Sequence, residues 1–179
     1  MDGNTAIANI LKMENTEYLF CFPANALIEA CAIAGIQPIM SRTERTTVNM
    51  ADGYTRVTNG RRTGVVATQS GPGIENAFGG IAHAYAESTP ILVSPGGTAR
   101  GRLGQSPDFD AMSAYNGVTK FASQINQTDR IPEMMRRAYT SLRTGRGGPV
   151  MVQVPGDVGS EKAPSRRTTN CLWGPAAAP

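Results

Sequence analysis

The sequence predicts a three-layer α/β/α fold in which helices cover both faces of a mostly parallel sheet of about six strands. Short runs of apolar residues alternate along the chain with longer segments whose apolar residues recur at helical spacing. The short runs are apolar throughout, which is typical of parallel strands that are buried on both faces. The 20 glycines and 12 prolines cluster between these segments and therefore mark turns.

The expected helices and strands follow one another in alternation. In residues 44–57, for example, Val48, Ala51 and Tyr54 share one helical face. The run TGVVAT at residues 63–68 is typical of a strand because it is short and rich in β-branched residues. Helices are expected over residues 5–13, 25–34, 44–57, 74–86 and 131–142, and strands over residues 17–22, 36–40, 63–68, 91–94 and 150–154.

Residues 1–159 are expected to form one domain, because a chain of 179 residues suits a single hydrophobic core. Residues 96–115 are too long and too rich in glycine for a plain connection, so they are a candidate functional loop. From residue 160 the composition changes to Lys, Arg, Ser, Pro and Ala without periodicity. Residues 160–179 are therefore expected to be a disordered tail or a truncated continuation.

Composition argues against several classes of protein. The net charge of +3 is small and the paired arginines are dispersed, so we expect no nucleic-acid binding. No apolar stretch approaches the roughly 20 residues that span a bilayer, and the N-terminus lacks a signal-type core, so we expect a cytoplasmic protein that does not bind membranes. Three cysteines without a CxxC pair argue against a disulfide framework, and a single histidine argues against a zinc site.

The loops after the strands are the places to look for a ligand site, because parallel sheets bind ligands outside the carboxyl ends of their strands. Pro23 and Ala24 follow the first strand, and residues 41–44 follow the second. Residues 70–73 follow the third strand and residues 95–97 the fourth. Many of these residues are small, and glycine lets the backbone approach a ligand closely. We therefore expect a flat small molecule to bind at this edge.

Glu44 is the candidate catalytic residue, and two interpretations of it compete. Ser41 and Glu44 have the spacing of a capping box, in which both side chains bond to the first backbone N–H groups of the following helix. In the functional interpretation, the carboxyl group exchanges a proton with a bound ligand. A helix N-terminus favours the ionised carboxylate, whereas proton exchange requires an apolar environment. The residues themselves leave both interpretations open.

The segment SGPGIEN at residues 70–76 follows a strand and opens a helix, where a phosphate-binding loop would lie. It does not fit the dinucleotide-binding fingerprint, because Asn76 occupies the third glycine position, and it lacks the Gly-Lys-Ser/Thr of a P-loop. A tight turn is the structural alternative. His83, in the middle of the next helix, is expected to be solvated, and no Ser-His-Asp or Cys-His set can be assembled around it.

Four segments resemble motifs of thiamine diphosphate (ThDP) enzymes, in the same order and at the same spacing. RTERTTVNMADGYTR at residues 42–56 resembles R-H-E-x-x-A-x-x-M-A-D-G-Y-A-R, and QSGPGIEN at residues 69–76 resembles T-S-G-P-G-x-x-N. GIAHAYAESTPI at residues 80–91 resembles G-I-A-x-A-Y-x-D-S-x-P-x, and residues 148–158 resemble the closing G-P-V...P-x-D-V. The resemblance covers about residues 3–159 and is to the N-terminal, pyrimidine-binding (PYR) domain of the acetolactate synthase-like group. It implies the Rossmann-like, ThDP-binding fold.

The resemblance also implies a role for Glu44. In the family, this carboxyl group bonds to N1′ of the cofactor's aminopyrimidine and promotes the imino tautomer, which removes the C2 proton of the thiazolium. The ylid formed in this way attacks a 2-keto acid or a related carbonyl compound, so the resemblance implies a lyase or transferase. The residues that it assigns to cofactor binding are Pro23, Ala24, Ser70, Gly71, Pro72, Gly73 and Asn76.

Three departures from the family pattern concern residues near the expected cofactor. The family's F-G-x-P-G after the first strand is FCFPA at residues 20–24, so that both glycines are replaced. Thr43 stands where the family has a histidine before the glutamate. Phe109 and Asp110 stand where it has Phe-Gln in the long loop. The departures leave the substrate and the reaction type open.

Complete members of the family are considerably longer, and they include a central domain and a pyrophosphate-binding (PP) domain that holds the diphosphate and its Mg²⁺. The resemblance therefore implies the PYR half of an enzyme that acts on a small-molecule substrate. Mg²⁺ is expected only through a partner PP domain, in a homo-oligomer or in a complex with a PP-domain chain. The alternatives are a stand-alone, non-catalytic binding or interaction module of the ThDP fold and a nucleotide-binding Rossmann domain.

Overall fold

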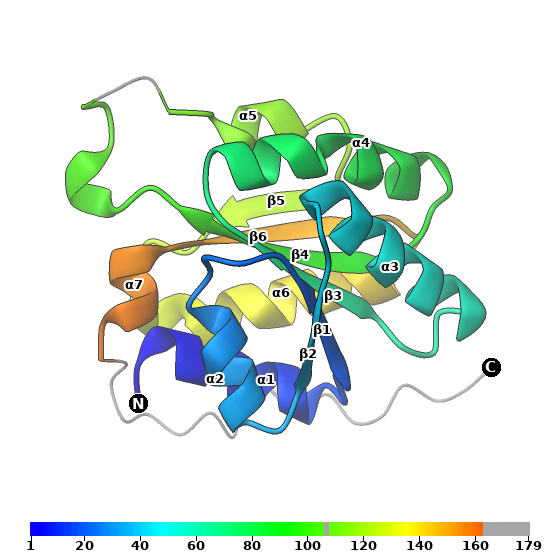
Figure 1. The fold of residues 1–179 in the computed structure, drawn as a ribbon, viewed down its shortest axis with the longest axis horizontal. Helices are drawn as coiled ribbons and strands as arrows, with labels where there is room; N and C mark the ends of the chain where they lie inside the picture. The colour runs from blue at the N-terminus through cyan, green and yellow to red at the C-terminus, as the bar shows by residue number, and fades with distance from the viewer. Residues whose placement is uncertain (106–107, 163–179) are drawn as a thin grey trace.

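Six parallel strands form the central sheet in the computed structural model, which describes residues 1–105 and 108–162. Helices lie on both faces of the sheet (Figure 1), and the order of elements confirms the three-layer α/β/α prediction. The elements are α1 (Gly3–Met13), β1 (Tyr18–Cys21), α2 (Leu27–Ile33), β2 (Gln37–Met40), α3 (Glu44–Val57), β3 (Gly64–Thr68), α4 (Pro72–Ala86), β4 (Ile91–Gly97), η1 (Arg100–Arg102), α5 (Ala111–Tyr115), β5 (Phe121–Gln124), η2 (Thr128–Arg130), α6 (Ile131–Arg143), β6 (Val150–Pro155) and α7 (Gly156–Ser160).

The strands lie in the order β2-β1-β3-β4-β6-β5, and each neighbouring pair is parallel. Residues of α1, α2 and α6 form the core on one face of the sheet, and residues of α3, α4 and α5 form the core on the other. Connections that run toward β2 use the first face, and connections that run toward β5 use the second. All the crossovers therefore have the same hand, as expected of parallel βαβ units.

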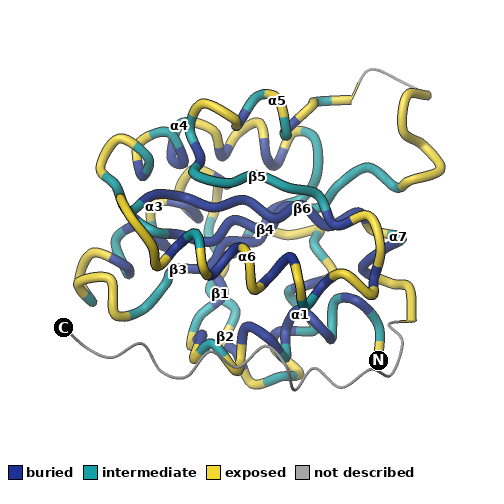
Figure 2. Tube along the Cα trace, turned by 180° about the vertical axis from the view of Figure 1, so that it is seen from behind, coloured by how far each residue is buried: buried dark blue, intermediate teal, exposed yellow. Residues whose placement is uncertain are grey.

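The middle of the sheet is buried more completely than its edges (Figure 2). Every residue of β3 and of β6 is buried, which agrees with their continuous apolar sequences. β5 is an edge strand that pairs only with β6 among the described residues, and its four residues are half-buried. Its sequence, FASQ, contains no apolar run, so the sequence analysis placed five strands and did not locate this one.

Two elements at the carboxyl edge are longer than predicted. β4 continues through Pro95 to Gly97, because Gly96 and Gly97 lie opposite Val154 and Pro155 of β6 in the parallel register. α4 begins at Pro72, two residues before the predicted start, since proline is well suited to the first turn of a helix.

A close approach between backbones fixes the position of α3 over β3. A Cβ atom on Gly64, the first residue of β3, would overlap the carbonyl group of Ala51 in the middle of α3. Helix α4 lies beside α3 in a similar way, because a Cβ on Gly80 would come within 2.9 Å of Cβ of Val48. The two helices whose first residues carry the candidate site are therefore held tightly against the sheet and against each other.

The described fold extends beyond residue 159. Ser160 is the last residue of α7, and Lys162 forms an antiparallel bridge with Asp2. The backbone N–H of Gly3 also donates to the carbonyl oxygen of Glu161, at 3.1 Å. The first three residues of the expected tail therefore pack against the N-terminus of the chain, and residues 163–179 lie outside the described residues.

Candidate active site

The sheet reverses its winding direction between β1 and β3. β1 is followed by β2 on one side, whereas β3 is followed by β4 on the other. A reversal of this kind opens a crevice at the carboxyl ends of the two strands, where ligands of parallel sheets bind. Residues 22–26 after β1 and residues 69–71 after β3 form the loops at this point. The fold thus places the crevice between segments that the sequence analysis had selected.

Glu44 is the first residue of α3 and lies at this edge of the sheet. The residue is only 6% exposed, which is rare for a glutamate without a close ion pair. Its Oε2 atom accepts a long hydrogen bond, 3.4 Å, from Nδ2 of Asn76 in the first turns of α4. Glu44 and Asn76, two residues that the resemblance assigned to one site, are therefore in contact.

The predicted capping box is not formed. The N-cap of α3 is Thr43, whose hydroxyl accepts a hydrogen bond from the N–H of Thr46. The Ser41 hydroxyl instead donates to the carbonyl of Thr43 at 2.8 Å and contacts the Thr47 hydroxyl. A capping serine must directly precede the first helical residue, and Ser41 lies too far upstream because the helix starts at Glu44. The Glu44 carboxyl is thus directed to Asn76 and not to a cap.

The start of α4 forms a second wall beside Glu44. Gly71 has a φ of +62°, a left-handed conformation that favours glycine, and it turns the chain from β3 into the helix at Pro72. A Cβ atom on Gly73 would lie 3.6 Å from Oε1 of Glu44 and 2.5 Å from Cγ of Gln69. Gly73 therefore lets the Gln69 side chain pack directly against the start of α4, beside the carboxyl group, where a larger residue would displace it.

Ser70 connects this wall to the end of β4. A Cβ atom on Gly96 would lie 3.2 Å from the backbone nitrogen of Ser70, so the two backbones are nearly in contact. Ser70 is half-buried, whereas Pro72 is exposed at the first position of its helix. Of the predicted cofactor-binding residues after β3, Gly73 and Asn76 lie closest to Glu44, and Ser70 and Gly71 shape the turn that brings them there.

The loop after β1 contains a strained residue and a residue that the sequence analysis missed. Pro23 and Ala24 are exposed, and Ala24 has a φ of +76°, in the region that favours glycine. The left-handed backbone agrees with the glycine that the resembling motif has at this position. Asn25 follows, and its amide donates to the carbonyls of Thr68 at 2.8 Å and Ser94 at 3.2 Å. Asparagine in a turn is common, but these long-range contacts leave no signal in the sequence.

The other predicted residues lie away from Glu44. His83 is exposed on α4, in agreement with the solvated interpretation. Asp110 caps α5 by accepting hydrogen bonds from the hydroxyl and the N–H of Ser113, and these bonds lower its pKa below the ordinary value. Phe109 packs edge-on against Tyr115, with ring centroids 6.4 Å apart. The Phe-Asp pair therefore has a structural role in this chain.

The cysteines near the crevice are not nucleophiles. Cys21, the last residue of β1, and Cys31 of α2 are both buried as free thiols. Burial raises the pKa of Cys21 to about 11 and that of Cys31 to about 12. Thiols with such values are protonated near neutral pH and do not react as thiolates. Glu44 therefore remains the candidate catalytic residue at the crevice.

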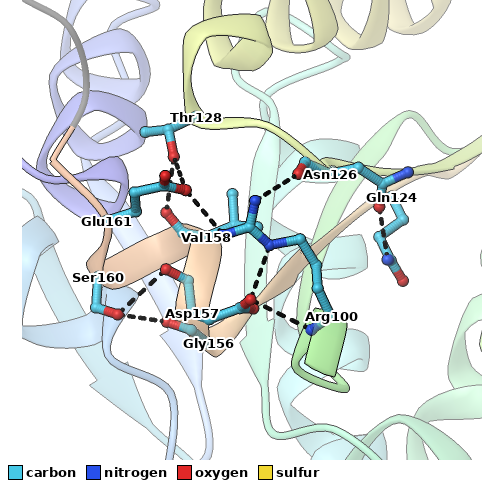
Figure 3. A network of polar contacts seen from close by, with 9 residues as sticks. All are labelled: Arg100, Gln124, Asn126, Thr128, Gly156, Asp157, Val158, Ser160 and Glu161. Atoms are coloured by element: carbon cyan, nitrogen blue, oxygen red, sulfur yellow. Dashed lines mark hydrogen bonds and ion pairs between the residues drawn. The ribbon is translucent and has the colours of Figure 1, made fainter. Parts of the chain in front are cut away.

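A second polar cluster, centred on Arg100, joins the carboxyl ends of β4, β5 and β6 (Figure 3). The Arg100 guanidinium donates to Asp157 at 2.8 Å, to Glu161 at 2.9 Å and to the carbonyl of Asn126 at 3.2 Å. The Glu161 carboxylate also accepts a hydrogen bond from the hydroxyl of Thr128. Every side-chain nitrogen of Arg100 thus has an acceptor, and we call this set of contacts the Arg100 tie.

Within residues 1–105 and 108–162, no three acidic, histidine or cysteine side chains converge in the manner of a metal site. No helix in the same ranges is long and apolar enough to cross a membrane.

Comparison with known proteins identifies the family. Residues 1–122 match the family described as thiamine pyrophosphate enzyme, N-terminal TPP binding domain. This match covers more than half of the chain and includes the crevice and Glu44. The chain belongs to this family. The resemblance of its motifs to the PYR domain of ThDP enzymes and the predicted fold class are thereby confirmed.

Several relatives of the chain are named as acetolactate synthase large subunits. The chain is 35% identical over 162 residues to the acetolactate synthase large subunit of Lactococcus lactis subsp. lactis, covering 87% of this chain and 28% of that protein. It is 32% identical over 163 residues to the corresponding subunit of Haemophilus influenzae, covering 88% of this chain and 28% of that protein. A probable acetolactate synthase large subunit of Methanocaldococcus jannaschii is 33% identical, with 88% and 27% covered. The chain thus spans little more than a quarter of the length of the relatives that it matches.

Proposed function

We propose that this chain is the PYR half of a ThDP-dependent lyase or transferase that acts on a 2-keto acid or a related carbonyl compound. One observation carries the proposal: a buried glutamate at the start of α3 faces the glycine-lined start of α4, at the point where the sheet reverses direction. Membership of the TPP-binding family and the acetolactate synthase relatives support the same conclusion.

The residues present fit the aminopyrimidine end of ThDP. A flat ring needs a wall from which no side chain projects, and Gly73 supplies such a wall close to Glu44: its absent Cβ position lies 3.6 Å from Oε1 of Glu44, and the Gln69 side chain packs against it. We propose that Oε1 shares a proton with N1′ of the ring while Asn76 holds Oε2. Ser70, Gly71, Pro72 and Gly73 would bound the ring from the β3 side, and Pro23 and Ala24 from the β1 side.

The chemistry of ThDP determines what the cofactor supplies to the reaction and what the chain must supply. When bound, ThDP supplies the carbanion chemistry that cleaves or forms bonds next to a carbonyl group. This chain supplies a carboxyl group that holds and releases a proton at a fixed atom, in a site that excludes most of the water around Glu44. General acid–base groups of this kind contribute typically about 100- to 10,000-fold to a rate.

We further propose that the diphosphate and Mg²⁺ are bound by a PP domain outside this segment, in a homo-oligomer or in a complex with a PP-domain chain. The chain aligns with little more than a quarter of each acetolactate synthase relative, so those proteins contain further sequence beyond the aligned part. On this proposal the chain alone binds the pyrimidine end weakly, and complete ThDP binds tightly only when the PP domain is present.

Titration calorimetry with the free aminopyrimidine half of thiamine tests the role of Glu44. Glu44→Gln keeps the shape of the side chain but removes the carboxylate, and hydrogen bonds to charged groups contribute about 1.5 to 3 kcal/mol. We therefore expect the Kd to rise about 10- to 100-fold. Glu75→Gln is the matched control, because Glu75 is exposed in the first turn of α4. Equal affinities for wild type and Glu44→Gln would show that Glu44 does not bind the ring.

A second titration tests the need for a partner. ThDP with Mg²⁺ is added to the chain alone and to the chain mixed with a PP-domain chain from an acetolactate synthase relative. Binding that tightens in the mixture, together with release of product from a 2-keto acid, supports the PYR-half proposal. Binding that is equally tight with and without the PP domain, with no turnover, supports a stand-alone, non-catalytic module.

A further inference from the structure

Asn25 occupies a position in the crevice that the proposed chemistry does not use. It lies in the loop between β1 and α2, and all of its side-chain polar atoms are engaged by the protein itself. Nδ2 donates to the carbonyl oxygens of Thr68 and Ser94, at 2.8 and 3.2 Å, and Oδ1 accepts a hydrogen bond from the N–H of Leu27 at 3.0 Å. We call this set of contacts the Asn25 tie.

The hydrogen bonds of the Asn25 tie begin where the backbone pairing of β1 with β3 ends. The last backbone hydrogen bond between the chain leaving β1 and β3 runs from the N–H of Phe22 to the carbonyl of Ala67, at 3.3 Å. The next carbonyl of β3, that of Thr68, and the carbonyl of Ser94 on β4 both accept from the Asn25 amide. One side chain from the β1 loop therefore reaches across β3 to β4 and binds the last carbonyl of β3 and a carbonyl in the middle of β4.

The tie also stabilises the unfavourable backbone beside it. Ala24 has a φ of +76°, a conformation that is costly for a residue with a Cβ atom. Such strain persists only where the surroundings fix the chain firmly, and the three hydrogen bonds of Asn25 do so from the next residue. Strained backbone of this kind concentrates at functional sites, which agrees with the position of Ala24 at the crevice.

A movement of the end of β3 would be transmitted to Glu44 through two close contacts. Thr68 is followed directly by Gln69 and Ser70, and the backbone nitrogen of Ser70 lies against Gly96. The side chain of Gln69 lies against Gly73, which in turn faces Oε1 of Glu44. There is little free space in this series of contacts, so a shift of Thr68 would move Gln69 and Gly73 relative to the Glu44 carboxyl group.

We infer that Asn25 is a positioning residue of the cofactor pocket. Its amide holds the end of β3 against the middle of β4 so that the start of α4 stays at the right distance from Glu44. Asn25 does not touch the pyrimidine on this view and acts through Thr68, Ser70 and Gly73. The inference rests on the proposed function, because it concerns the same site.

Asn25→Asp tests the inference. Aspartate keeps an acceptor for the N–H of Leu27 but offers no donor to Thr68 and Ser94 when it is ionised, so it removes the tie without removing the start of α2. We expect the Kd for the free aminopyrimidine half of thiamine to rise at least about tenfold, as for the loss of one or two hydrogen bonds. Asn116→Asp, on an exposed asparagine after α5, controls for the added charge.

A stability-matched control separates positioning from general destabilisation. Ile7→Val shortens a fully buried side chain in the core on the α1 face. It lowers stability without touching the carboxyl edge. If Asn25 acts by positioning, the Ile7→Val variant binds the aminopyrimidine with the affinity of the wild type, whereas the Asn25→Asp variant binds it more weakly. Equal losses of affinity in both variants would overturn the inference.

The remaining outcomes are distinguishable. If the wild type does not bind the aminopyrimidine, the proposed function fails and the inference fails with it. If the wild type and Asn25→Asp bind equally well, only the inference about Asn25 fails. Should Asn25→Asp not fold, the measurement is repeated in the Ala24→Gly background, where the left-handed backbone is no longer strained. There, affinity equal to that of Ala24→Gly alone overturns the inference, and a tenfold loss supports it.

Discussion

The two halves of the carboxyl edge are held together by different chemistry. Next to Glu44, the end of β3 and the middle of β4 are joined to the β1 loop by the Asn25 tie, which is uncharged and bonds to backbone carbonyls. Farther along, the ends of β4, β5 and β6 are joined by the Arg100 tie, which links a guanidinium to two carboxylates (Figure 3). The Arg100, Asp157 and Glu161 side chains are 40, 33 and 47% exposed.

The difference between the Asn25 tie and the Arg100 tie indicates what each half of the carboxyl edge requires. Ion pairs with this exposure are screened by solvent and salt, so they hold the chain without contributing much stability. An amide that bonds to backbone carbonyls is little affected by salt and adds no net charge beside the Glu44 carboxyl. The half that carries the proposed proton-transfer group is therefore fixed by neutral contacts, and the charged contacts lie at the other end of the edge.

The largest difference in aminopyrimidine affinity is expected between two glycine-to-alanine substitutions, one in each half of the carboxyl edge. Gly73→Ala places a methyl group 3.6 Å from Oε1 of Glu44 and 2.5 Å from Cγ of Gln69, so it displaces the Gln69 side chain beside the proposed pyrimidine site. We expect aminopyrimidine affinity to fall on the order of 10- to 100-fold, since overpacking costs about 1 to 3 kcal/mol. Gly101→Ala in η1 has open space around its new methyl group and leaves the affinity unchanged. Calorimetric titration of both variants would contradict the comparison if they behaved alike.

Removing the neutral tie should have the next largest effect. Asn25→Ala leaves the carbonyls of Thr68 and Ser94 without their donor, which lowers the free energy of unfolding by about 1 to 3 kcal/mol. Because no ion pair is lost, the same decrease is expected in urea titrations at low salt and at about 0.5 M NaCl. Asn116→Ala serves as the exposed control. A loss that disappears in high salt would mean that the tie is electrostatic after all.

A smaller change, an increase in the free energy of unfolding, is expected when Ala24 is replaced. Replacing it with glycine removes the cost of a left-handed backbone and adds unfolded-state entropy, for a net gain of about 0.5 to 1 kcal/mol. Ala99→Gly, at an alanine with a φ of −56° before η1, is expected to lower the free energy of unfolding instead. Thermal and urea unfolding of the two variants compare the halves directly. Destabilisation by both substitutions would show that the Ala24 backbone is not strained.

The smallest effect is expected from the charged tie. Arg100→Gln removes both ion pairs, and the resulting loss of stability should shrink as salt is raised. Arg102→Gln, at an exposed arginine of the same turn, is the control. Burial alone would raise the pKa of Asp157, but the hydrogen bonds and charge of Arg100 outweigh it and hold that pKa below the ordinary value of 3.8.

The lowered pKa of Asp157 determines how the stability provided by the Arg100 tie depends on pH. A carboxyl group whose pKa is lowered by folding stabilises the folded state above its unfolded pKa and loses this contribution as the pH falls through the folded value. The stability difference between wild type and Arg100→Gln should therefore be constant near neutral pH, begin to shrink as the pH falls through the ordinary value of 3.8, and vanish only below the lowered pKa of Asp157 in the folded state. A difference that persisted in acid would mean that Asp157 is not the partner that matters.

Several elements of the fold were predictable because local and long-range requirements agree. The apolar strands β3 and β6 are buried on both faces, so their sequences indicate their position without ambiguity. Helix α3 was predicted with the bounds that it has, because its apolar face and the preceding polar loop both mark the start at Glu44. Strand β5 was not found, since an edge strand with half-buried residues needs no apolar run.

The site was less predictable than the fold, for a physical reason. Glu44 could be selected from its place after a strand, and the motifs indicated its partners. Of the two interpretations left open for Glu44, the capping box with Ser41 was wrong, because Thr43 is the residue that caps a helix beginning at Glu44. Asn25 was missed because its partners, Thr68 and Ser94, are distant in the chain and bond through backbone carbonyls. Contacts that involve backbone atoms place no demand on the identity of the partner residue.

The close approach of Gly64 to Ala51 has a consequence for transplanting the site into another protein. Gly64 lies at the amino end of β3, at the opposite end of the strand from the ligand edge, yet it sets how near α3 comes to the sheet. A larger residue there would lift the helix and carry Glu44 away from Gly73. A protein engineer who grafts the glutamate and the glycine-rich turn onto a new scaffold must therefore also copy this distant glycine.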